Sequence, residues 1–327
     1  MVKLSDVADL AKVSVTTVSR VINNYGSLSQ KTKDKVWSAI NELNYQPNNL
    51  ARSLQGKKTQ LIGLIFPGVS NPFFGELVQT LENQLFDKGY RVILCNSANN
   101  AEKERAYLRM LSANQVDGII TGTHNLGIEE YEKVSVPIVS SDRHLGDHIP
   151  IVTSNNYQGG RLATTSLVNT GSKKITIITG ANSPENPTNE RLQGYLDILK
   201  KNKLSTNKLE LPFSMTPQLK RIAIKDLLMN EHPDAIFCTD DLNAILVSDI
   251  ATEEHIEIPQ QLKLIGYDGT QFIQQYYPKL ATVIQPIAEI SALLIDLLLK
   301  QIDDPAITLD KLYSLPVKLQ ISESLLA

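Results

Sequence analysis

The chain begins with a stretch that decides how its first domain folds: Asp6-Val7-Ala8, then Val13-Ser14-Val15-Thr16-Thr17-Val18-Ser19-Arg20-Val21-Ile22-Asn23. Two short helices are predicted, because apolar side chains recur at helical spacing and would face one small core: Val7, Ala8, Ala11, Val18 and Ile22. Ser14 is the expected cap of the second helix. Its outward face carries side chains that read base edges or bind phosphates: Thr16, Thr17, Ser19, Arg20 and Asn23. The pattern predicts a helix-turn-helix that enters DNA.

A third helix and a short linker follow this motif. Residues 29–44 predict a helix capped by Ser29, with an inner stripe formed by Val36, Ile40 and Leu43. Pro47-Asn48 ends it, and residues 49–55 are too few to form a stable helix alone. We therefore expect a DNA-binding head at residues 1–46, a hinge or linker at 47–58 and a larger body at 59–327.

The distribution of charge agrees with a DNA-binding head. Residues 1–60 hold nine Lys and Arg against four Asp and Glu, a net charge of +5. The remaining residues hold 23 against 31, a net charge of −8, so the overall charge of −3 hides an asymmetry. Only the head offers the basic surface that neutralisation of phosphates requires.

Length and composition place the chain among soluble multi-domain proteins. Its 327 residues, 42% of them hydrophobic, can bury the cores of two or three domains. No apolar run approaches the roughly 20 residues of a membrane span, and no basic-then-apolar leader begins the chain, so we expect a cytoplasmic protein. Cys95 and Cys238 end apolar runs, which favours buried free thiols over a disulfide.

Beyond the linker, apolar runs alternate with amphipathic stretches, which predicts parallel α/β sheets. The expected strands are 61–66, 91–95, 118–121, 137–140, 175–179, 235–239 and 262–267. Their number and the length of the body favour two doubly wound lobes. Ligands bind such folds at the carboxyl ends of strands. Several strands end there in polar or special residues: Phe66-Pro67, Ser141-Asp142-Arg143, Thr179-Gly180, Thr239-Asp240-Asp241 and Tyr267-Asp268-Gly269.

The sequence lacks the signatures of an enzyme. It has no P-loop, dinucleotide fingerprint, Gly-x-Ser-x-Gly elbow or paired Cys-x-x-Cys motif. His144 and His148 lie in a polar loop without a cysteine partner, so no metal site is predicted. Asp240 and Asp241 form a carboxylate pair, but Asp241 is better interpreted as the cap of a helix over residues 242–251. We expect no catalysis and no cofactor.

The head is similar to that of the lactose/galactose-repressor family of bacterial transcription regulators. The motifs that carry this similarity are Asp6-Val7-Ala8, Val13-Ser14, residues 17–23, Leu43-Asn44-Tyr45-Gln46-Pro47-Asn48 and Ala51-Arg52-Ser53-Leu54. The body continues it at Ile62-Gly63-Leu64, Asn71-Pro72-Phe73-Phe74, Gly89-Tyr90, Val116-Asp117-Gly118, Gly159-Gly160, residues 191–195, residues 265–268 and Gln285-Pro286. Residues 48–56 and 113–120 most resemble sucrose operon repressors.

The resemblance implies a small helical head, a hinge helix and a periplasmic-binding-protein-like body of two doubly wound lobes. One lobe would hold residues 59–160 and 286–314, and the other residues 161–285 and 315–327. In the head, it assigns base edges to Val15, Thr16 and Arg20, and phosphates to Ser14, Thr17, Asn23, Thr32 and Tyr45. The alternative is that these are solvated positions on a small helical domain. Lys3 stands where the family often has Thr or Ser, which predicts a weaker start for the first helix.

The hinge of the family gives Leu54 a specific role. By resemblance it enters the minor groove as a wedge, from a helix paired with that of a second subunit. Ala51 would allow close pairing of these helices, and Arg52 and Gln55 would contact the groove or backbone. The alternative is a simple linker leucine. A segment this short is expected to fold only on DNA and against its partner.

The resemblance also implies an effector site between the lobes, formed by Phe73, Phe74, Arg143, Arg191, Asp240, Asp268 and Gln285. A carboxylate at Asp268 can accept hydrogen bonds from neighbouring sugar hydroxyls, and a phenyl ring can stack on a sugar face. Arg143 with Arg191 would suit a sugar phosphate. The alternatives are that one phenylalanine belongs to the core, that Asp268 and Arg191 form an internal ion pair, and that Arg143 is solvated.

The resulting prediction is an effector-controlled repressor that binds a pseudo-palindromic operator as a homodimer. The expected dimer surface is residues 74–86, and the absence of a leucine-heptad extension after residues 320–327 favours a dimer over a tetramer. The similarity to sucrose operon repressors favours release by a sugar. Three alternatives stay open: a sugar-binding transport protein, a corepressor-dependent carbon regulator, and control by a phosphocarrier protein.

Overall fold

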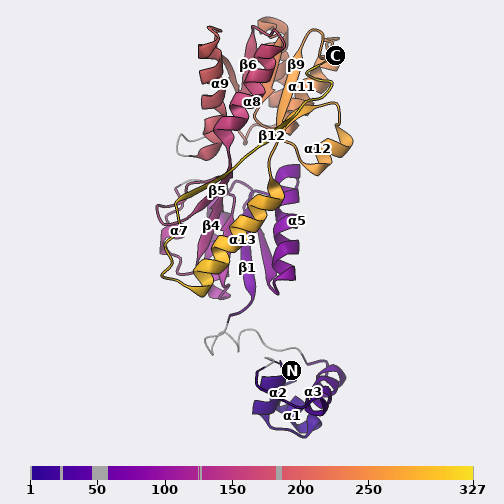
Figure 1. The fold of residues 1–327 in the computed structure, drawn as a ribbon, viewed down its shortest axis with the longest axis vertical. Helices are drawn as coiled ribbons and strands as arrows, with labels where there is room; N and C mark the ends of the chain where they lie inside the picture. The colour runs from indigo at the N-terminus through magenta and orange to yellow at the C-terminus, as the bar shows by residue number, and fades with distance from the viewer. Residues whose placement is uncertain are drawn as a thin grey trace. The chain divides into compact units, whose positions relative to one another are not determined.

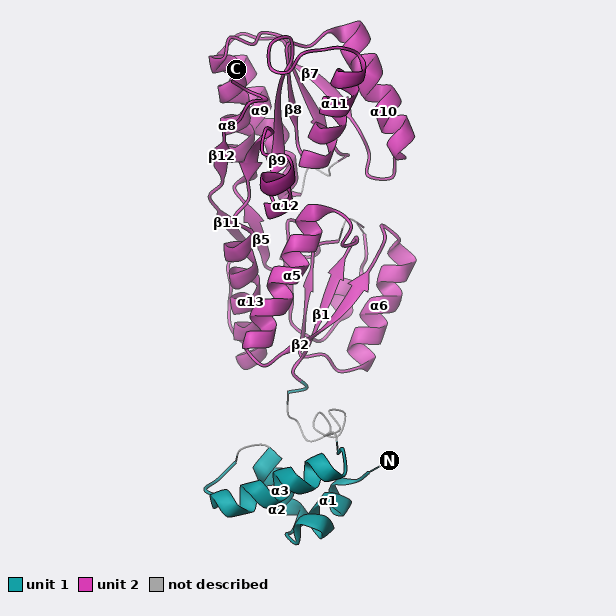
Figure 2. Ribbon diagram, turned by 90° about the vertical axis from the view of Figure 1, so that its right-hand side faces the viewer, with its two compact units in different colours: residues 1–59 teal, residues 60–327 magenta. Residues whose placement is uncertain are grey.

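The computed structural model describes residues 2–22, 25–45, 58–123, 125, 127–181 and 186–326. The chain divides into two compact units, residues 1–59 and residues 60–327, which we call the head and the body (Figure 2). No helix among the described residues combines the length and the apolar character that crossing a bilayer requires.

The described part of the head holds three helices: α1 Leu4–Ala11, α2 Val15–Ile22 and α3 Gln30–Glu42 (Figure 1). They enclose one small core, formed by Val7, Ala8, Ala11, Val18, Val21, Val36, Ala39 and Ile40. The prediction that Ile22 faces this core was only partly right, since Val21 is buried and Ile22 is half-buried. Val18 and Val21 are three positions apart and share the inner side of α2, whereas Ile22 packs at its edge.

Short polar contacts fix where the head helices begin. Ser14 Oγ accepts a hydrogen bond of 3.1 Å from Thr17 N at the start of α2, as predicted. Ser29 Oγ accepts one of 3.3 Å from Thr32 N at the start of α3. Lys3 gives α1 no side-chain cap, but the Asp6 carboxylate accepts a hydrogen bond of 2.8 Å from Lys3 N. The start of α1 is therefore stabilised by the side chain of Asp6, the third residue of the helix.

The first lobe of the body is built on a six-stranded parallel sheet in the order β11-β5-β4-β3-β1-β2. Its strands are β1 Leu61–Phe66, β2 Arg91–Asn96, β3 Gly118–Thr121, β4 Ile138–Ser141, β5 Ile151–Ser154 and β11 Leu312–Leu315. One face is covered by α5 Pro72–Asp87 and α13 Ile287–Asp303 (Figure 2). The other face is covered by α6 Ala101–Ala113 and α7 Glu130–Lys133.

The second lobe repeats this plan in the order β12-β10-β9-β8-β6-β7, with only β12 antiparallel to its neighbour. Its strands are β6 Ile175–Thr179, β7 Asn207–Glu210, β8 Ala235–Cys238, β9 Lys263–Asp268, β10 Ala281–Ile284 and β12 Lys318–Gln320. One face carries α8 Asn156–Asn169 and α9 Glu190–Lys201, the latter preceded by the 3₁₀ turn η1 Pro187–Asn189. The other carries α10 Pro217–Asp226, the π-helical turn η2 Leu227–Glu231, α11 Asp241–Glu253 and α12 Gln271–Tyr276.

Continuous apolar strands explain why each sheet is covered on both faces. In β1, Ile62 and Leu64 pack toward α5 and α13, whereas Ile65 packs toward α6. All seven predicted strands coincide with observed strands to within one residue at each end. Cys95 and Cys238 are buried free thiols, in agreement with the sequence, and burial raises the pKa of Cys95 to about 11.

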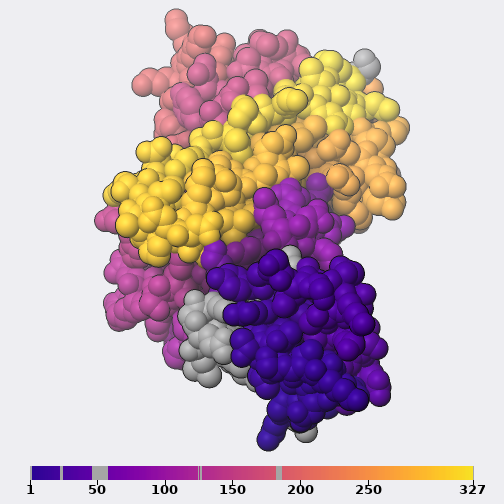
Figure 3. Space-filling model, turned by 60° about the horizontal axis from the view of Figure 1, so that its bottom comes forward, coloured from indigo at the N-terminus to yellow at the C-terminus, as the bar shows by residue number. Residues whose placement is uncertain are grey.

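Within the described residues the chain passes between the lobes three times. It crosses at Asn155 between β5 and α8, at Gln285-Pro286 between β10 and α13, and after Leu315 between β11 and β12. The first crossing precedes the expected boundary near residue 160, because α8 starts at once and packs in the second lobe. In the space-filling view the C-terminal residues, in yellow, extend over both lobes (Figure 3). Each lobe therefore contains segments that are distant in sequence.

Candidate functional site

The head exposes on α2 the side chains that the sequence assigned to base edges. Val15 is 46% exposed, and Thr16 and Arg20 are exposed beside it. Ser14 Oγ and Thr17 Oγ1 share a hydrogen bond of 2.9 Å where this helix begins. The helix thus presents a small apolar group, a hydroxyl and a guanidinium outward, which suits contacts with base edges in a major groove.

The remaining predicted DNA contacts are spread over the head and the linker. Thr32 Oγ1 shares a hydrogen bond of 2.8 Å with Ser29 Oγ at the start of α3. Tyr45 is half-buried against the head core, and this burial raises the pKa of its hydroxyl. The other predicted contacts lie outside the described residues: Asn23, Ala51, Leu54 and Gln55.

In the body, one cavity between the lobes brings together all seven residues predicted for the effector: Phe73, Phe74, Arg143, Arg191, Asp240, Asp268 and Gln285. They come from both lobes and follow the carboxyl ends of strands or begin helices, as a doubly wound fold requires. Among the lining residues absent from the predicted site are Asn71 of the first lobe and Thr188 and Phe213 of the second.

Arg191 lines the cavity from the second lobe and is almost fully buried. Its Nε donates a hydrogen bond of 2.7 Å to Asn156 Oδ1, and its Nη1 donates one of 2.6 Å to the carbonyl of Thr239. Its guanidinium carbon lies 3.6 Å from the centroid of the Tyr267 ring. These contacts leave one edge of the guanidinium beside Asp268, with 3.9 Å between Arg191 Nη1 and Asp268 Oδ1.

Asp268 ends β9 and is held in an unusual backbone conformation, with φ at 121°. Its Oδ1 accepts a hydrogen bond of 2.8 Å from Gln285 Nε2. Burial raises the pKa of the Asp268 carboxyl well above its usual range, against the opposing effect of Arg191, and Asp241 and Asp240 raise it further. The internal ion pair that the sequence offered as an alternative is therefore present, and it lines the cavity rather than a closed core.

The neighbouring aspartates differ from the prediction. The cap of α11 is Asp240, whose carboxylate accepts a hydrogen bond of 2.8 Å from Asn243 N. Asp241 is the first residue of that helix and lies buried. Its carboxylate accepts hydrogen bonds of 2.7 Å from Gly269 N and 2.6 Å from Thr282 Oγ1. The interpretation of Asp241 as the cap was wrong because its side chain turns inward to the strands. Burial raises its pKa to about 7.

Arg143 is the second cation of the cavity and is buried rather than solvated. Its Nη1 donates hydrogen bonds of 2.8 Å to Thr188 Oγ1 and 2.9 Å to the carbonyl of Asp142. Burial lowers the pKa of Arg143 to about 10; Asp142 opposes this lowering and Arg191 adds to it. The cavity therefore holds two guanidinium groups together with the carboxylates of Asp142, Asp240 and Asp268.

Aromatic rings from both lobes line the cavity. Asn71 caps α5 by accepting a hydrogen bond of 2.8 Å from Phe73 N, which places Phe73 and Phe74 on the first turn. Phe73 is buried in the core and meets Phe74 edge to face at 5.4 Å between ring centroids. Phe73 is thus the phenylalanine that belongs to the core, while the rings of both Phe73 and Phe74 line the cavity. Phe213 adds a third ring from the second lobe.

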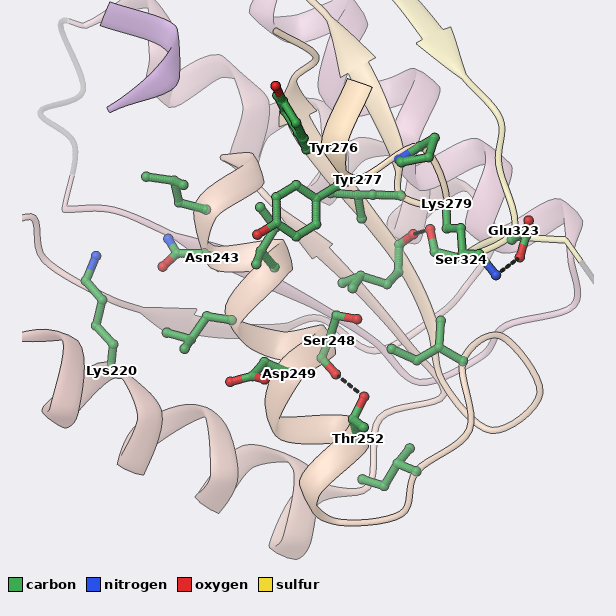
Figure 4. A pocket seen from close by; sticks show the side chains of 18 of the residues that line it. Lys220, Asn243, Ser248, Asp249, Thr252, Tyr276, Tyr277, Lys279, Glu323 and Ser324 are labelled. Atoms are coloured by element: carbon green, nitrogen blue, oxygen red, sulfur yellow. Dashed lines mark hydrogen bonds and ion pairs between the residues drawn. The ribbon is translucent and has the colours of Figure 1, made fainter. Parts of the chain in front are cut away.

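A larger and more open hollow runs along α11 in the second lobe (Figure 4). Figure 4 shows Tyr276 and Tyr277 above this helix, with Asn243, Asp249 and Thr252 along it. Its polar groups mainly serve the fold, since Thr252 Oγ1 donates to Ser248 O and Lys279 pairs with Glu323. It lacks the buried, converging charges of the cavity between the lobes.

Comparison with known proteins identifies both units. "Bacterial regulatory proteins, lacI family" matches residues 3–48, and "Periplasmic binding proteins and sugar binding domain of LacI family" matches residues 59–308. The sucrose operon repressor of Pediococcus pentosaceus is 56% identical over 97% of this chain and 97% of its own length. That of Streptococcus mutans serotype c is 51% identical over 98% and 99%.

Solved structures agree with these matches. The lac repressor dimer bound to operator and the anti-inducer ONPF has a TM-score of 0.84 at 26% identity, covering 100% of this chain and 99% of that one. A regulator from Alkaliphilus metalliredigens complexed with D-xylulofuranose has a TM-score of 0.73 at 33% identity, covering 82% and 100%. These relatives are regulators, in agreement with the prediction that the chain is not an enzyme. The chain belongs to the LacI family of bacterial regulatory proteins.

Proposed function

We propose that this chain represses a sucrose-utilisation operon as a homodimer, and that a sugar or sugar phosphate bound between its lobes releases it from the operator. The observation that carries the proposal is the meeting of Arg191, Asp268 and Gln285 at the floor of one cavity. Three relatives that are 48–56% identical are named sucrose operon repressors, which supports sucrose as the sugar whose utilisation this chain controls. A repressor of this kind acts in the cytoplasm.

The polar groups of the cavity fit a ligand with several hydroxyl groups. Gln285 is 3% exposed, and its Oε1 is buried without a hydrogen-bond partner in the described structure. A sugar hydroxyl can donate to this oxygen, and another can accept from a guanidinium of the cavity. The rings of Phe74 and Phe213 offer apolar faces for the sugar ring.

The two guanidinium groups extend this fit to a phosphorylated sugar. A phosphate accepts two parallel hydrogen bonds from a guanidinium, which is a stronger contact than one from a neutral donor. Arg143 would take that role, because its hydrogen bonds to Thr188 and Asp142 use Nη1 alone, whereas those of Arg191 to Asn156 and Thr239 use both Nε and Nη1. Replacement of Arg143 by Gln would then weaken binding of the phosphorylated sugar while leaving the affinity for the neutral sugar nearly unchanged.

In the head, we propose that Val15, Thr16 and Arg20 read bases and that Ser14, Thr17, Thr32 and Tyr45 position the phosphate backbone. The hinge roles of Ala51, Leu54 and Gln55 and the phosphate contact of Asn23 stay predictions. Because phosphate contacts release counterions, affinity for the operator must fall steeply as salt rises.

A homodimer is supported by apolar side chains that the body leaves exposed. Tyr276 is 64% exposed, and Phe272, Tyr277 and Leu242 are also exposed; Leu242, on α11, lines the same hollow as the two tyrosines, and we call these four residues the α12 patch. Phe272 lies 5.1 Å from Tyr276 and 6.1 Å from Tyr277 between ring centroids, so the rings form one surface. We propose that a second copy covers this patch and residues 74–86 of α5, since two heads on a two-fold operator require an isologous interface.

The deciding experiment combines calorimetry with fluorescence anisotropy. Purified chain is titrated with sucrose, sucrose 6-phosphate, D-fructose and D-fructose 6-phosphate, and each sugar is then added to a complex with labelled operator. We expect one of these to bind in the micromolar to millimolar range and to release the operator. Tighter operator binding with the sugar would reverse the sign of control, and affinity for DNA independent of salt would overturn the repressor assignment.

A further inference from the structure

Behind the cavity, a buried amide lies at the place where the chain first crosses between the lobes. Asn156 is 1% exposed and is the first residue of α8, directly after β5 and Asn155. It does not line the cavity, so the proposed function gives it no contact with a sugar. Its side chain nevertheless touches groups of both lobes.

This amide contacts both lobes: its Nδ2 donates to the first lobe alone, and its Oδ1 makes its shortest contact with the second lobe, although Ser154 Oγ of the first lobe also lies 3.5 Å from it. On the first-lobe side, Asn156 Nδ2 donates hydrogen bonds of 2.8 Å to Thr153 Oγ1 and 3.0 Å to the carbonyl of Ser154. On the second-lobe side, Asn156 Oδ1 accepts the hydrogen bond of 2.7 Å from Arg191 Nε. The hydroxyl of Tyr267 lies 3.5 Å from the same oxygen.

These contacts continue into the cavity at both ends. Thr153 Oγ1 donates a hydrogen bond to Asp142 Oδ1, and Asp142 lines the first-lobe wall. Arg191 lines the second-lobe wall beside Asp268. A continuous run of buried polar contacts thus joins one wall of the cavity to the other through the crossing, and Asn156 is its middle member.

An amide suits this position, because one end must donate and the other must accept. A carboxylate would accept from Arg191 but could not donate to Thr153, and it would add a negative charge beside Asp142. The position of the amide is fixed by the close contact of α8 and α9. A Cβ on Gly160 would lie 2.2 Å from the carbonyl oxygen of Arg191, and one on Gly194 would lie 2.4 Å from that of Tyr157.

We propose that Asn156 is a positioning residue that couples the effector cavity to the orientation of the lobes. It holds Arg191 toward the cavity and connects that side chain, through Thr153, to Asp142 on the opposite lobe. A ligand that engages Arg191 therefore acts directly on the crossing about which the lobes turn. This inference rests on the proposed function, in that the cavity must bind an effector.

The test compares Asn156→Asp with Asn155→Asp, which makes the same chemical change one residue earlier. Asn155 caps α8 by accepting a hydrogen bond of 2.9 Å from Gln158 N, and Asp is an equally good cap. Calorimetry gives the affinity for the sugar that binds the wild type best, and anisotropy gives the affinity for operator with and without it. For Asn156→Asp we expect operator affinity without sugar within about threefold of wild type, and sugar affinity weaker by about tenfold or more. Asn155→Asp should match the wild type in both.

A second variant separates coupling from binding. Thr153→Val keeps the contact between Asn156 and Arg191 but removes the connection to Asp142. We expect it to bind the sugar within about threefold of wild type, while the loss of operator affinity at saturating sugar shrinks by about tenfold. Thr153→Val also tests the proposed coupling by itself if the Asn156→Asp protein does not fold. Full coupling in Thr153→Val, or wild-type sugar binding and release in Asn156→Asp, overturns the inference. A wild type that binds none of the four sugars contradicts the proposed effector instead.

Discussion

The guanidinium of Arg191 stacks on the ring of Tyr267, with 3.6 Å between its carbon and the ring centroid. This contact orients the guanidinium so that Nε meets Asn156 and Nη1 meets Thr239 and approaches Asp268. A planar group with several fixed donors is needed for such an arrangement, and an ammonium cannot replace it. The cavity wall is therefore set by the shape of one side chain as much as by its charge.

Arg191→Lys should accordingly weaken sugar binding while keeping the charge. We expect a loss of about 1.5–3 kcal/mol, or roughly tenfold to more than a hundredfold in Kd, because hydrogen bonds to a charged group are removed. Isothermal calorimetry measures this effect. The control is Arg161→Lys, an exposed arginine that stacks on Tyr157 at 5.6 Å. Equal sugar affinity in both variants would contradict the role of the guanidinium.

Gly160→Ala should destabilise the second lobe. The added Cβ would lie 2.2 Å from the carbonyl oxygen of Arg191, and backbone on both sides must move to make room. Overpacking of this kind costs about 1–3 kcal/mol, which urea unfolding measures. Gly68→Ala is the control, because its nearest neighbours would be 3.8 Å away. Unchanged stability in Gly160→Ala would show that α8 and α9 separate easily.

Asp241 should give the folded body a pH dependence of opposite sign to that of a salt-bridged carboxylate. Burial raises its pKa from 3.8 to about 7, so the folded protein holds a proton that the unfolded chain has lost. Its contribution to stability is complete below the unfolded pKa and is lost as pH rises toward the folded pKa. The unfolding free energy of the wild type should fall relative to Asp241→Asn between about pH 4 and pH 7. Parallel curves for the two proteins would rule this out.

Tyr276→Asp should dissociate the proposed dimer. A charge in the centre of the α12 patch opposes its burial against a second copy. Light scattering coupled to gel filtration should show monomers at micromolar concentration, and operator affinity should fall because each head then binds alone. Met110→Asp changes an exposed apolar residue of α6 as the control. A dimeric Tyr276→Asp protein would move the interface elsewhere.

Arg20→Ala should relax the preference of the head for its operator. A bidentate contact to a base is worth about 1–3 kcal/mol of discrimination, so the ratio of specific to scrambled DNA affinity should fall by roughly fivefold to more than a hundredfold. Lys35→Ala removes an exposed charge from α3 and should lower the affinity for both DNAs to a similar, smaller extent. Gel-shift titrations with both DNAs measure the ratio, and an unchanged ratio in Arg20→Ala would exclude base reading by this residue.

The sequence was most informative where periodicity and chemistry coincide. β1, β3 and β6 are continuous apolar runs and were placed correctly at both ends. Arg143, Asp240 and Asp268 follow predicted strands, so a strand end located each of them, whereas the family resemblance was needed for Phe73, Phe74, Arg191 and Gln285. β7 was missed because Asn207–Glu210 is a polar edge strand of the second-lobe sheet, and β11 because Leu312–Leu315 alternates at an edge of the first-lobe sheet.

Other features depend on packing that a pattern does not contain. Thr188 lies in η1, away from any strand end, and Phe213 follows β7, a strand that the sequence did not predict, yet both line the cavity. Adjacent aspartates at 240 and 241 are equivalent as caps by residue type. Which one turns inward is decided by Gly269 and Thr282, far along the chain.

The three crossings between the lobes also determine the order in which the protein can be completed during synthesis. The first sheet lacks its edge strand β11 and its covering helix α13 until residues 287–315 have left the ribosome. By then β6, β7, β8, β9 and β10 of the second lobe have already been made. The lobe that is translated first is therefore finished late, and a chain that stops before residue 287 exposes apolar surface around Ile62, Leu64 and Val139. Premature termination thus yields a nascent chain prone to aggregation.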